Sequence, residues 1–432
     1  MAILIKNGRI VNPATNMDMR GDVLIENDRI KQVAPYIEAQ AEQIIEAYGC
    51  IVMPGFIDLH VHLREPGFEY KETIETGTRA AAKGGFTTIC AMPNTNPAID
   101  TPEQVQFVLD KSKEAGNVHV IPVGAVTYGQ QGEQITDIAG MKSRGAGAIS
   151  EDGKSVMNTY VYREAMKVAA REDIAVFAHC EDKSLAGNGC INEGKKSQEY
   201  QVPGISNTVE DVIVARDILL AKETGARLHL CHCSTKDSVT LTKMAKEAGV
   251  KVTAEVCPHH FVLSEDDIVN ADSNYKMNPP LRSKEDVEAL KLGLKAGVID
   301  AISTDHAPHH EDEKRQHIST APFGIVGLET AAALTFTELV CKGWLTPMQM
   351  AEKMSYNPAK ILKIDKGDLS EGKIADITIL NPAWEYTIDV NEFASKGKNT
   401  PFHGRKVKGR VVYTIVDGRI VFDKVKESSS EG

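Results

Sequence analysis

The middle of the chain alternates short apolar segments with helical segments, and this alternation constrains the fold more than any other feature of the sequence. From about Pro54 to about Lys366, each apolar run typical of a buried strand is followed by a segment with helical periodicity. Eight such units over about 300 residues fit a closed (β/α)₈ barrel better than an open doubly wound sheet. No glycine-rich phosphate-binding fingerprint follows the first strand, which argues against dinucleotide binding.

The predicted elements follow from this alternation. The first strand is predicted as an apolar run over 51–57 that continues into 58–64. The other strands are predicted at 87–92, 119–123, 146–150, 175–178, 227–231, 250–256 and 299–303. The helices are predicted at 71–83, 102–115, 134–143, 159–171, 209–224, 239–248, 284–296 and 328–340.

Both ends of the chain have the pattern of antiparallel strands, with short apolar runs separated by turn signals such as Asn7-Gly8 and Asp417-Gly418. Neither end is long enough to bury a core alone. We therefore predict one small β-sandwich domain assembled from residues 1–53 and 367–432, with the (β/α)₈ barrel at 54–366 between them.

Composition excludes several classes of partner. The formal net charge of -11 argues against nucleic acid, which requires clustered Lys and Arg. No apolar run approaches the roughly 20 residues that span a bilayer, and the N-terminus lacks the pattern of a signal peptide. Eight cysteines without a repeated spacing are typical of free thiols in a reducing compartment. We predict a cytoplasmic protein.

The segment Asp58-Leu59-His60-Val61-His62-Leu63-Arg64 carries the first chemical signal. Alternate side chains of a strand share a face, so His60, His62 and Arg64 are expected to project together. Two imidazoles beside a guanidinium indicate a metal site with a group that binds anions. A His-x-His pair also occurs by chance on polar strands, so the other strand ends decide between the two interpretations.

Those strand ends carry further ligands. Barrel active sites gather at the carboxyl ends of strands, and four such ends carry Asp152, His179, His232 and Asp305. Imidazole and carboxylate ligands suit Zn²⁺, with Mn²⁺, Co²⁺ or Fe²⁺ as substitutes. Six ligands exceed the need of one catalytic zinc but suit two metals about 3.5 to 4 Å apart, with Asp152 as the bridge and Asp305 as the base.

Four motifs carry a family resemblance. They are Asp58 to Gly67, Met92-Pro93-Asn94-Thr95, Met277 to Arg282, and Thr304-Asp305-His306-Ala307-Pro308-His309. In this order they closely resemble the dihydroorotases of the amidohydrolase superfamily, and more narrowly the class I, bacterial-type enzymes, over essentially the whole chain. The resemblance implies reversible cyclisation of N-carbamoyl-L-aspartate to L-dihydroorotate in pyrimidine biosynthesis.

The resemblance also assigns roles to individual residues. It implies one zinc on His60, His62 and Asp305, a second on His179 and His232, and Asp152 shared between them. It implies that the substrate is bound by His62, Arg64, Asn94, Asn278, His309 and the backbone near Phe323 and Gly324. Where the family commonly has Asp-Asp-Gly, this chain has Glu151-Asp152-Gly153, and the position before glycine favours Asp152 over Glu151 as the bridge. Many relatives use a carboxylated lysine there, but no lysine ends the fourth strand.

Two other functions remain as alternatives. Hydantoinases and allantoinases share the barrel and the His-x-His strand, but their substrates lack the ring carboxylate that Arg64 is expected to bind. A non-catalytic scaffold that partners aspartate transcarbamoylase would be expected to lose ligands, whereas all six positions are kept here. The resemblance further implies a homodimer, with aspartate transcarbamoylase as a candidate partner.

Two further segments lie outside the strand and helix pattern. Residues 309–320 are highly charged without apolar periodicity, which is typical of a solvated loop; a lid that closes over the substrate is the functional alternative. The tail 428–432 is predicted to be disordered.

Overall fold

A barrel of eight parallel strands forms the framework of the chain. The computed structural model describes residues 2–430. The strand order is β15-β14-β13-β10-β9-β8-β7-β6, so neighbouring strands of the barrel follow one another along the sequence. A parallel bridge between Val61 and His306, with the His62 amide donating to the His306 carbonyl at 2.8 Å, joins the first strand to the end of the last. The predicted (β/α)₈ barrel is confirmed.

The elements of the barrel lie close to their predicted positions. Its strands are β6 (Phe56–Val61), β7 (Phe86–Ala91), β8 (His119–Ala125), β9 (Ala148–Ser150), β10 (Ala175–Ala178), β13 (Arg227–Leu230), β14 (Val252–Val256) and β15 (Ala301–Ile302). Its main helices are α1 (Ile74–Gly84), α2 (Pro102–Ala115), α3 (Ile138–Arg144), α4 (Thr159–Arg171), α7 (Thr208–Thr224), α8 (Lys236–Glu247), α10 (Lys284–Lys295) and α12 (Ala331–Thr335).

Shorter elements extend the connections at the strand ends. They are η2 (Tyr128–Gln130), α5 (Lys183–Ala186), β11 (Ile191–Asn192), α6 (Lys195–Glu199), β12 (Gly204–Ile205), α9 (Pro258–Val262), η3 (Glu265–Asp267), η4 (Ser273–Tyr275) and α11 (Glu311–Lys314). After α12 the chain continues through η5 (Phe336–Val340), α13 (Pro347–Ala351), η6 (Glu352–Tyr356) and α14 (Asn357–Leu362). Of these, η5 lies within the helix predicted at 328–340. The sequence did not predict the others, and a single helical turn or a two-residue strand leaves no periodicity to detect. The continuous helical run over 347–362 was also not predicted.

Local signals explain why α2 has the predicted bounds. Thr101 caps its N-terminus by accepting from the Gln104 amide, Pro102 occupies the first turn, and Gly116 ends the helix in the left-handed region at φ 64°. Each signal lies within the segment itself, so the sequence alone defines the helix.

The predicted strand over 51–57 is in fact two strands in different sheets. β5 (Ile51–Pro54) belongs to the sheet of the chain ends, whereas β6 belongs to the barrel. Gly55 separates them, and a Cβ at this position would lie 2.3 Å from the side chain of Thr87. The chain therefore needs a glycine where it passes between the two sheets.

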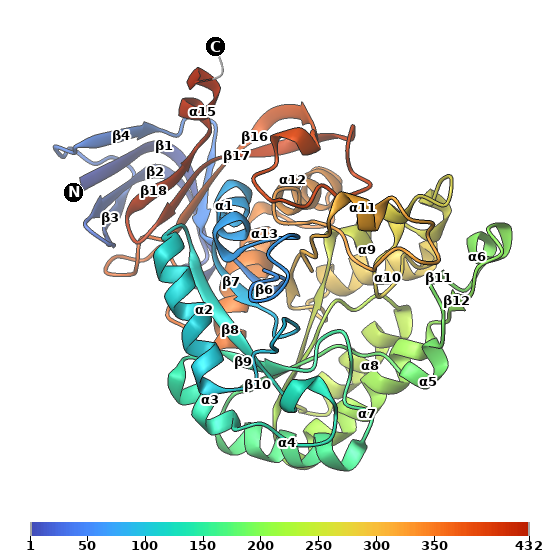
Figure 1. Ribbon diagram of the computed structural model, residues 1–432. Coiled ribbons are helices and arrows are strands. Elements are labelled where there is room, and N and C mark those ends of the chain that lie inside the picture. Colours follow the sequence, from blue (N-terminus) through green and yellow to red (C-terminus); the bar gives the residue numbers. More distant parts are fainter. Residues whose placement is uncertain (1, 431–432) are drawn as a thin grey trace.

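The second sheet combines both ends of the chain, as Figure 1 shows with the blue and red strands side by side. Its order is β18-β17-β16-β5-β1-β2-β3, with β4 paired to β1. The strands are β1 (Ala2–Asn12), β2 (Met17–Glu26), β3 (Arg29–Ala34), β4 (Gln43–Glu46), β16 (Ile377–Thr387), β17 (Lys406–Val416) and β18 (Arg419–Asp423), with η1 (Pro13–Thr15) and η7 (Val390–Glu392) beside them. A β domain assembled from both termini is confirmed, while the exact boundaries at 53 and 367 stay predictions.

Two further expectations concern the chain as a whole. None of the helices within residues 2–430 is long and apolar enough to cross a membrane. The predicted disordered tail is only partly covered, because 428–430 end helix α15 (Lys424–Ser430) and 431–432 lie outside the described residues.

A buried carboxyl on α7 lies behind the end of β10. Asp217 is 1% exposed, accepts from the Arg216 guanidinium at 2.8 Å and lies 3.9 Å from the Cys180 thiol. Burial raises the pKa of Asp217 to about 6, although the charge of Arg216 opposes the rise.

We expect this carboxyl to make the stability depend on pH. A carboxyl whose pKa is higher in the folded than in the unfolded state stabilises the fold fully below its unfolded-state pKa. This contribution is lost as the pH rises through the folded-state pKa of about 6. Asp217→Asn cannot titrate, so the unfolding free energy of the native protein minus that of the variant should fall by on the order of 1 kcal/mol between about pH 5 and about pH 7. Urea unfolding of both proteins measures this, and a difference that does not change with pH would contradict it.

Candidate metal centre

All six predicted ligands lie at the carboxyl ends of barrel strands. His60 is in β6 and His62 follows it; the others follow β9, β10, β13 and β15. All six side chains are buried. The backbone is left-handed at His232 (φ 36°) and Asp305 (φ 48°), where the chain leaves its strand.

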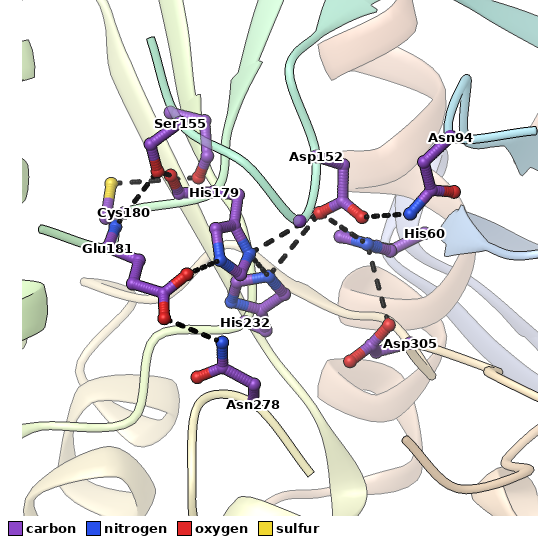
Figure 2. A network of polar contacts seen from close by, with 12 residues as sticks. His60, Asn94, Asp152, Ser155, His179, Cys180, Glu181, His232, Asn278 and Asp305 are labelled. Carbon is purple, nitrogen blue, oxygen red and sulfur yellow. Dashed lines mark hydrogen bonds and ion pairs between the residues drawn. The ribbon is translucent and has the colours of Figure 1, made fainter. Parts of the chain in front are cut away.

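The carboxylate of Asp152 lies at the centre of this group, between His60 and the pair His179 and His232 in Figure 2. Its Oδ1 is 3.2 Å from His60 Nε2, 3.6 Å from His179 Nδ1 and 3.8 Å from His232 Nε2. Its Oδ2 is 3.5 Å from His62 Nε2. One carboxylate therefore lies close to all four imidazoles, as a bridging ligand requires.

Asp305 completes one side of the group. Its Oδ1 lies 3.1 Å from His62 Nε2 and 3.6 Å from His60 Nε2. The ligand atoms of His60, His62 and Asp305 all lie within 4.8 Å of one another, as do those of His60, Asp152 and His232. This spacing is that of ligands around shared cations.

Unpaired buried atoms test whether a metal fits here. Within the described residues, His60 Nε2 and Asp152 Oδ1 have no hydrogen-bond partner although both are buried. His179 Nδ1 and His232 Nε2 approach to 3.0 Å with both atoms near the Asp152 carboxylate. Leaving such polar atoms unpaired is costly, and a divalent cation would satisfy all of them. The donor set therefore fits metal.

Three of the four imidazoles are oriented through their other ring nitrogen, while His232 Nδ1 has no hydrogen-bond partner in the described residues. His60 Nδ1 lies 3.2 Å from Glu255 Oε1, His62 Nδ1 lies 2.8 Å from Asn94 Oδ1, and His179 Nε2 lies 3.0 Å from Glu181 Oε2. An N–H donated to an acceptor in this way leaves the opposite nitrogen free to bind metal.

Sequence reasoning missed two of these orienting groups, Glu181 and Glu255. Both had a readable signal. Glu181 follows His179 by two residues at a strand end, and Glu255 is the only charged residue in strand β14. Glu181 also accepts from the Asn278 amide at 3.1 Å, so one carboxylate links a predicted metal ligand to a predicted substrate group.

The carboxylate of Glu151 points away from the centre. It accepts hydrogen bonds from the amides of Val126 and Thr127 at 3.1 Å and from the Thr127 hydroxyl. Its oxygens are therefore used by the preceding connection, while those of Asp152 face the histidines. The geometry favours Asp152 as the bridge.

A cavity of ≈ 310 Å³ opens beside the ligands and contains every predicted substrate residue. Its walls include His62, Arg64, Asn94, Asn278, His309, Phe323 and Gly324. One detail of the sequence argument was wrong: β6 ends at Val61, and Arg64 has φ 63°, so strand alternation does not align His62 and Arg64. The turn after the strand brings them to the same cavity instead.

Arg64 adds a positive charge to the cavity wall. Arg64 donates to the Pro308 carbonyl at 3.1 Å, and its Nη2 lies 3.3 Å from His309 Nε2. His309 Nε2 donates to the Phe323 carbonyl at 2.8 Å, so Nδ1 is free to accept from Lys71 at 3.3 Å. Burial and the neighbouring charges of Arg64 and Lys71 lower the pKa of His309, which keeps the imidazole neutral. This wall is suited to an anionic ligand.

Comparison with known proteins agrees with the geometry. A family model described as dihydro-orotase-like matches residues 49–238. A protein named dihydroorotase from Geobacillus sp. (strain WCH70) is 50% identical over 428 residues, covering 99% of this chain and 100% of that protein. Another dihydroorotase, from Acetivibrio thermocellus, is 48% identical over 419 residues, covering 97% and 98%.

Among solved structures, an L-hydantoinase (dihydropyrimidinase) from Arthrobacter aurescens superposes with a TM-score of 0.88 at 27% identity, covering 98% of this chain and 96% of that one. A dihydropyrimidinase from Brevibacillus agri superposes with a TM-score of 0.85 at 24% identity, covering 98% and 95%, and shows the shared fold alone.

The two adjacent carboxylates after β9 allow a matched test of the bridge. We expect Asp152→Asn to lower the amount of metal bound per chain, because the substitution removes the carboxylate charge that lies within 3.8 Å of all four imidazoles. Glu151→Gln changes a carboxylate of the same turn that faces Val126 and Thr127, and should keep its metal. Elemental analysis of both purified variants measures this; loss of metal from the Glu151 variant alone would reverse the assignment.

Proposed function

Because the chain belongs to the dihydroorotase family and has the cyclic amide hydrolase function of that family, we propose that its six converging ligands hold two Zn²⁺ ions and act on dihydroorotate. The observation that carries this proposal is the Asp152 carboxylate close to four imidazoles, at the wall of a cavity that also contains Arg64. His60, His62 and Asp305 would hold one ion, His179 and His232 the other, and Asp152 both.

When bound, two zinc ions would acidify water and polarise the scissile carbonyl. In the hydrolytic direction the amide C–N bond of the ring breaks and water adds across it. The hydroxyl goes to the carbonyl carbon, which becomes a carboxylic acid and then a carboxylate by releasing a proton to solvent, and the ring nitrogen gains a proton and becomes the carbamoyl NH₂. Ring closure is the same sequence reversed, and no oxidant or cofactor is consumed.

Asp305 is the proposed proton carrier. Its Oδ1 lies 3.1 Å from His62 Nε2, at the edge of the ligand group that faces the cavity. The carboxylate takes the proton of the attacking water and returns it to the departing ring nitrogen, so one group serves as base and then as acid.

Arg64 is the proposed group that binds the ring carboxylate. Its guanidinium is held by the Pro308 carbonyl and lies beside the neutral His309. A guanidinium can bind a carboxylate through two parallel hydrogen bonds. Asn94 and Asn278 line the same cavity, and their partners His62 and Glu181 fix them relative to the metal ligands.

The alternatives fit less well. A hydantoinase activity is favoured by the TM-score of 0.88 to an L-hydantoinase, but full-length relatives near 50% identity are named dihydroorotase. A scaffold without activity would have no need for a complete set of buried ligands. A homodimer, an association with aspartate transcarbamoylase and a cytoplasmic location stay predictions.

We expect Arg64→Met to raise KM for dihydroorotate by about tenfold or more, because the variant loses a charge-assisted interaction made in both ground and transition states. Arg64→Lys keeps the positive charge but lacks the planar guanidinium, so its KM should lie between those of Arg64→Met and the native protein. Steady-state kinetics measure both, and a native KM in Arg64→Met would remove Arg64 from this role.

Asp305→Ala should abolish most of kcat while part of the metal is retained, because the remaining ligands still converge on Asp152. Turnover and elemental analysis of the same sample measure this. Native protein treated with a chelator is the control, and should lose hydrolysis and regain it with Zn²⁺. Ordinary turnover in Asp305→Ala would exclude the base assignment, and activity that survives full metal removal would exclude the metal mechanism.

A further inference from the structure

The charged segment after β15 contains a buried lysine that neither the metal centre nor the proposed reaction uses. Lys314 ends the short helix α11 and is only 7% exposed. All three hydrogen bonds that its Nζ donates in the described part of the chain go to carbonyl oxygens: Pro322 at 3.0 Å, Gly324 at 3.0 Å and Lys276 at 3.3 Å. An ammonium held by neutral acceptors is costly to bury.

Burial, with the nearby charge of Lys276, lowers the pKa of Lys314 to about 7. The titratable groups around it are Lys276 before Asn278, Asp272 beside η4, and Glu313 on α11, and the two carboxylates oppose the lowering only in part. A side chain that is retained at such a cost is expected to serve a purpose other than stability.

The three carbonyls that Lys314 contacts belong to two segments of the cavity region. Pro322 and Gly324 stand on either side of Phe323, so the ammonium brackets the Phe323–Gly324 peptide that lines the cavity. The third carbonyl, that of Lys276, also accepts from the Gly324 amide at 3.0 Å. Lys314 therefore joins the Phe323–Gly324 wall to the segment that carries Asn278.

The same peptide holds the anion-binding side chains in place. Its Phe323 carbonyl accepts from His309 Nε2 at 2.8 Å, and His309 lies beside Arg64. Gly324 has φ 124°, and a Cβ there would lie 2.6 Å from the Cβ of Ala307, so this backbone has little freedom to adjust by itself. A shift of the Phe323 carbonyl would move His309, and with it the environment of Arg64.

We propose that Lys314 is a positioning residue for substrate binding: its ammonium fixes the Phe323–Gly324 wall, and through His309 it fixes the pocket for the carboxylate. The inference rests on the proposed function, because it concerns the same cavity. The proposal also assigns a role to the charged segment 309–320: Lys314 at the end of α11 supports the cavity wall on the side away from the cavity.

A second buried lysine provides a matched control. Lys353 is 3% exposed and donates to the Ile299 carbonyl at 2.9 Å. Ile299 precedes β15, whereas the cavity lies beyond the other end of that strand, at Asp305. Lys314→Met and Lys353→Met each remove a buried ammonium bound to backbone, but only the first lies behind the cavity wall.

The test compares thermal midpoint, metal content, kcat and KM for dihydroorotate in the two variants and the native protein. We expect both variants to lose stability and to keep their metal. Lys314→Met should raise KM by about tenfold with kcat changed much less, because the carboxylate contacts act in ground and transition states alike. Lys353→Met should keep a near-native KM.

A KM in Lys314→Met equal to that in Lys353→Met would overturn the proposal and leave Lys314 a purely structural residue. If Lys314→Met does not fold, Lys314→Gln retains an uncharged donor and should show a smaller rise in KM; a native KM in that variant overturns the proposal equally. Failure of the native, metal-loaded protein to act on dihydroorotate would instead refute the proposed function, so the two failures are distinct.

Discussion

The site depends on one electrostatic constraint: two buried carboxylates and four imidazoles are brought together away from water. Asp152 lies within 3.8 Å of a ring nitrogen of each of the four histidines, and two of the buried ligand atoms lack partners in the described residues. Such a group would be costly to bury without cations. The rest of the site serves to hold these groups against each other, with Glu255, Asn94 and Glu181 setting the orientation of three rings.

The barrel makes this arrangement possible because it brings distant residues to one rim. His60 and Asp305 are far apart in sequence, yet the bridge between Val61 and His306 places the first and last strands side by side. The ends of β9, β10 and β13 bring the remaining ligands to the same edge. Strand parallelism therefore converts a spacing along the chain into a cluster in space.

The cavity wall depends on a different kind of interaction. Lys314, His309 and Arg64 act through backbone carbonyls of the connections that follow the strands. Parallel strands fix where such connections start, but only these polar contacts fix their course. This side of the cavity thus depends on contacts with backbone carbonyls, whereas the ligand group depends on contacts between side chains at the strand ends.

The sequence by itself determined the barrel, the β domain from both chain ends and the residues that form the ligand group, because strand and helix periodicity and the strand-end histidines are local signals. The capping residues of α2 are local signals of the same kind, and they set the ends of that helix. Only the tertiary structure separated β5 from β6, placed Arg64 beyond the strand, turned Glu151 away from Asp152, and showed Glu181, Glu255 and Lys314 in supporting positions. The physical reason is that these outcomes depend on contacts between residues distant along the chain: close approach at Gly55, closure of the barrel, and buried polar groups that must find partners.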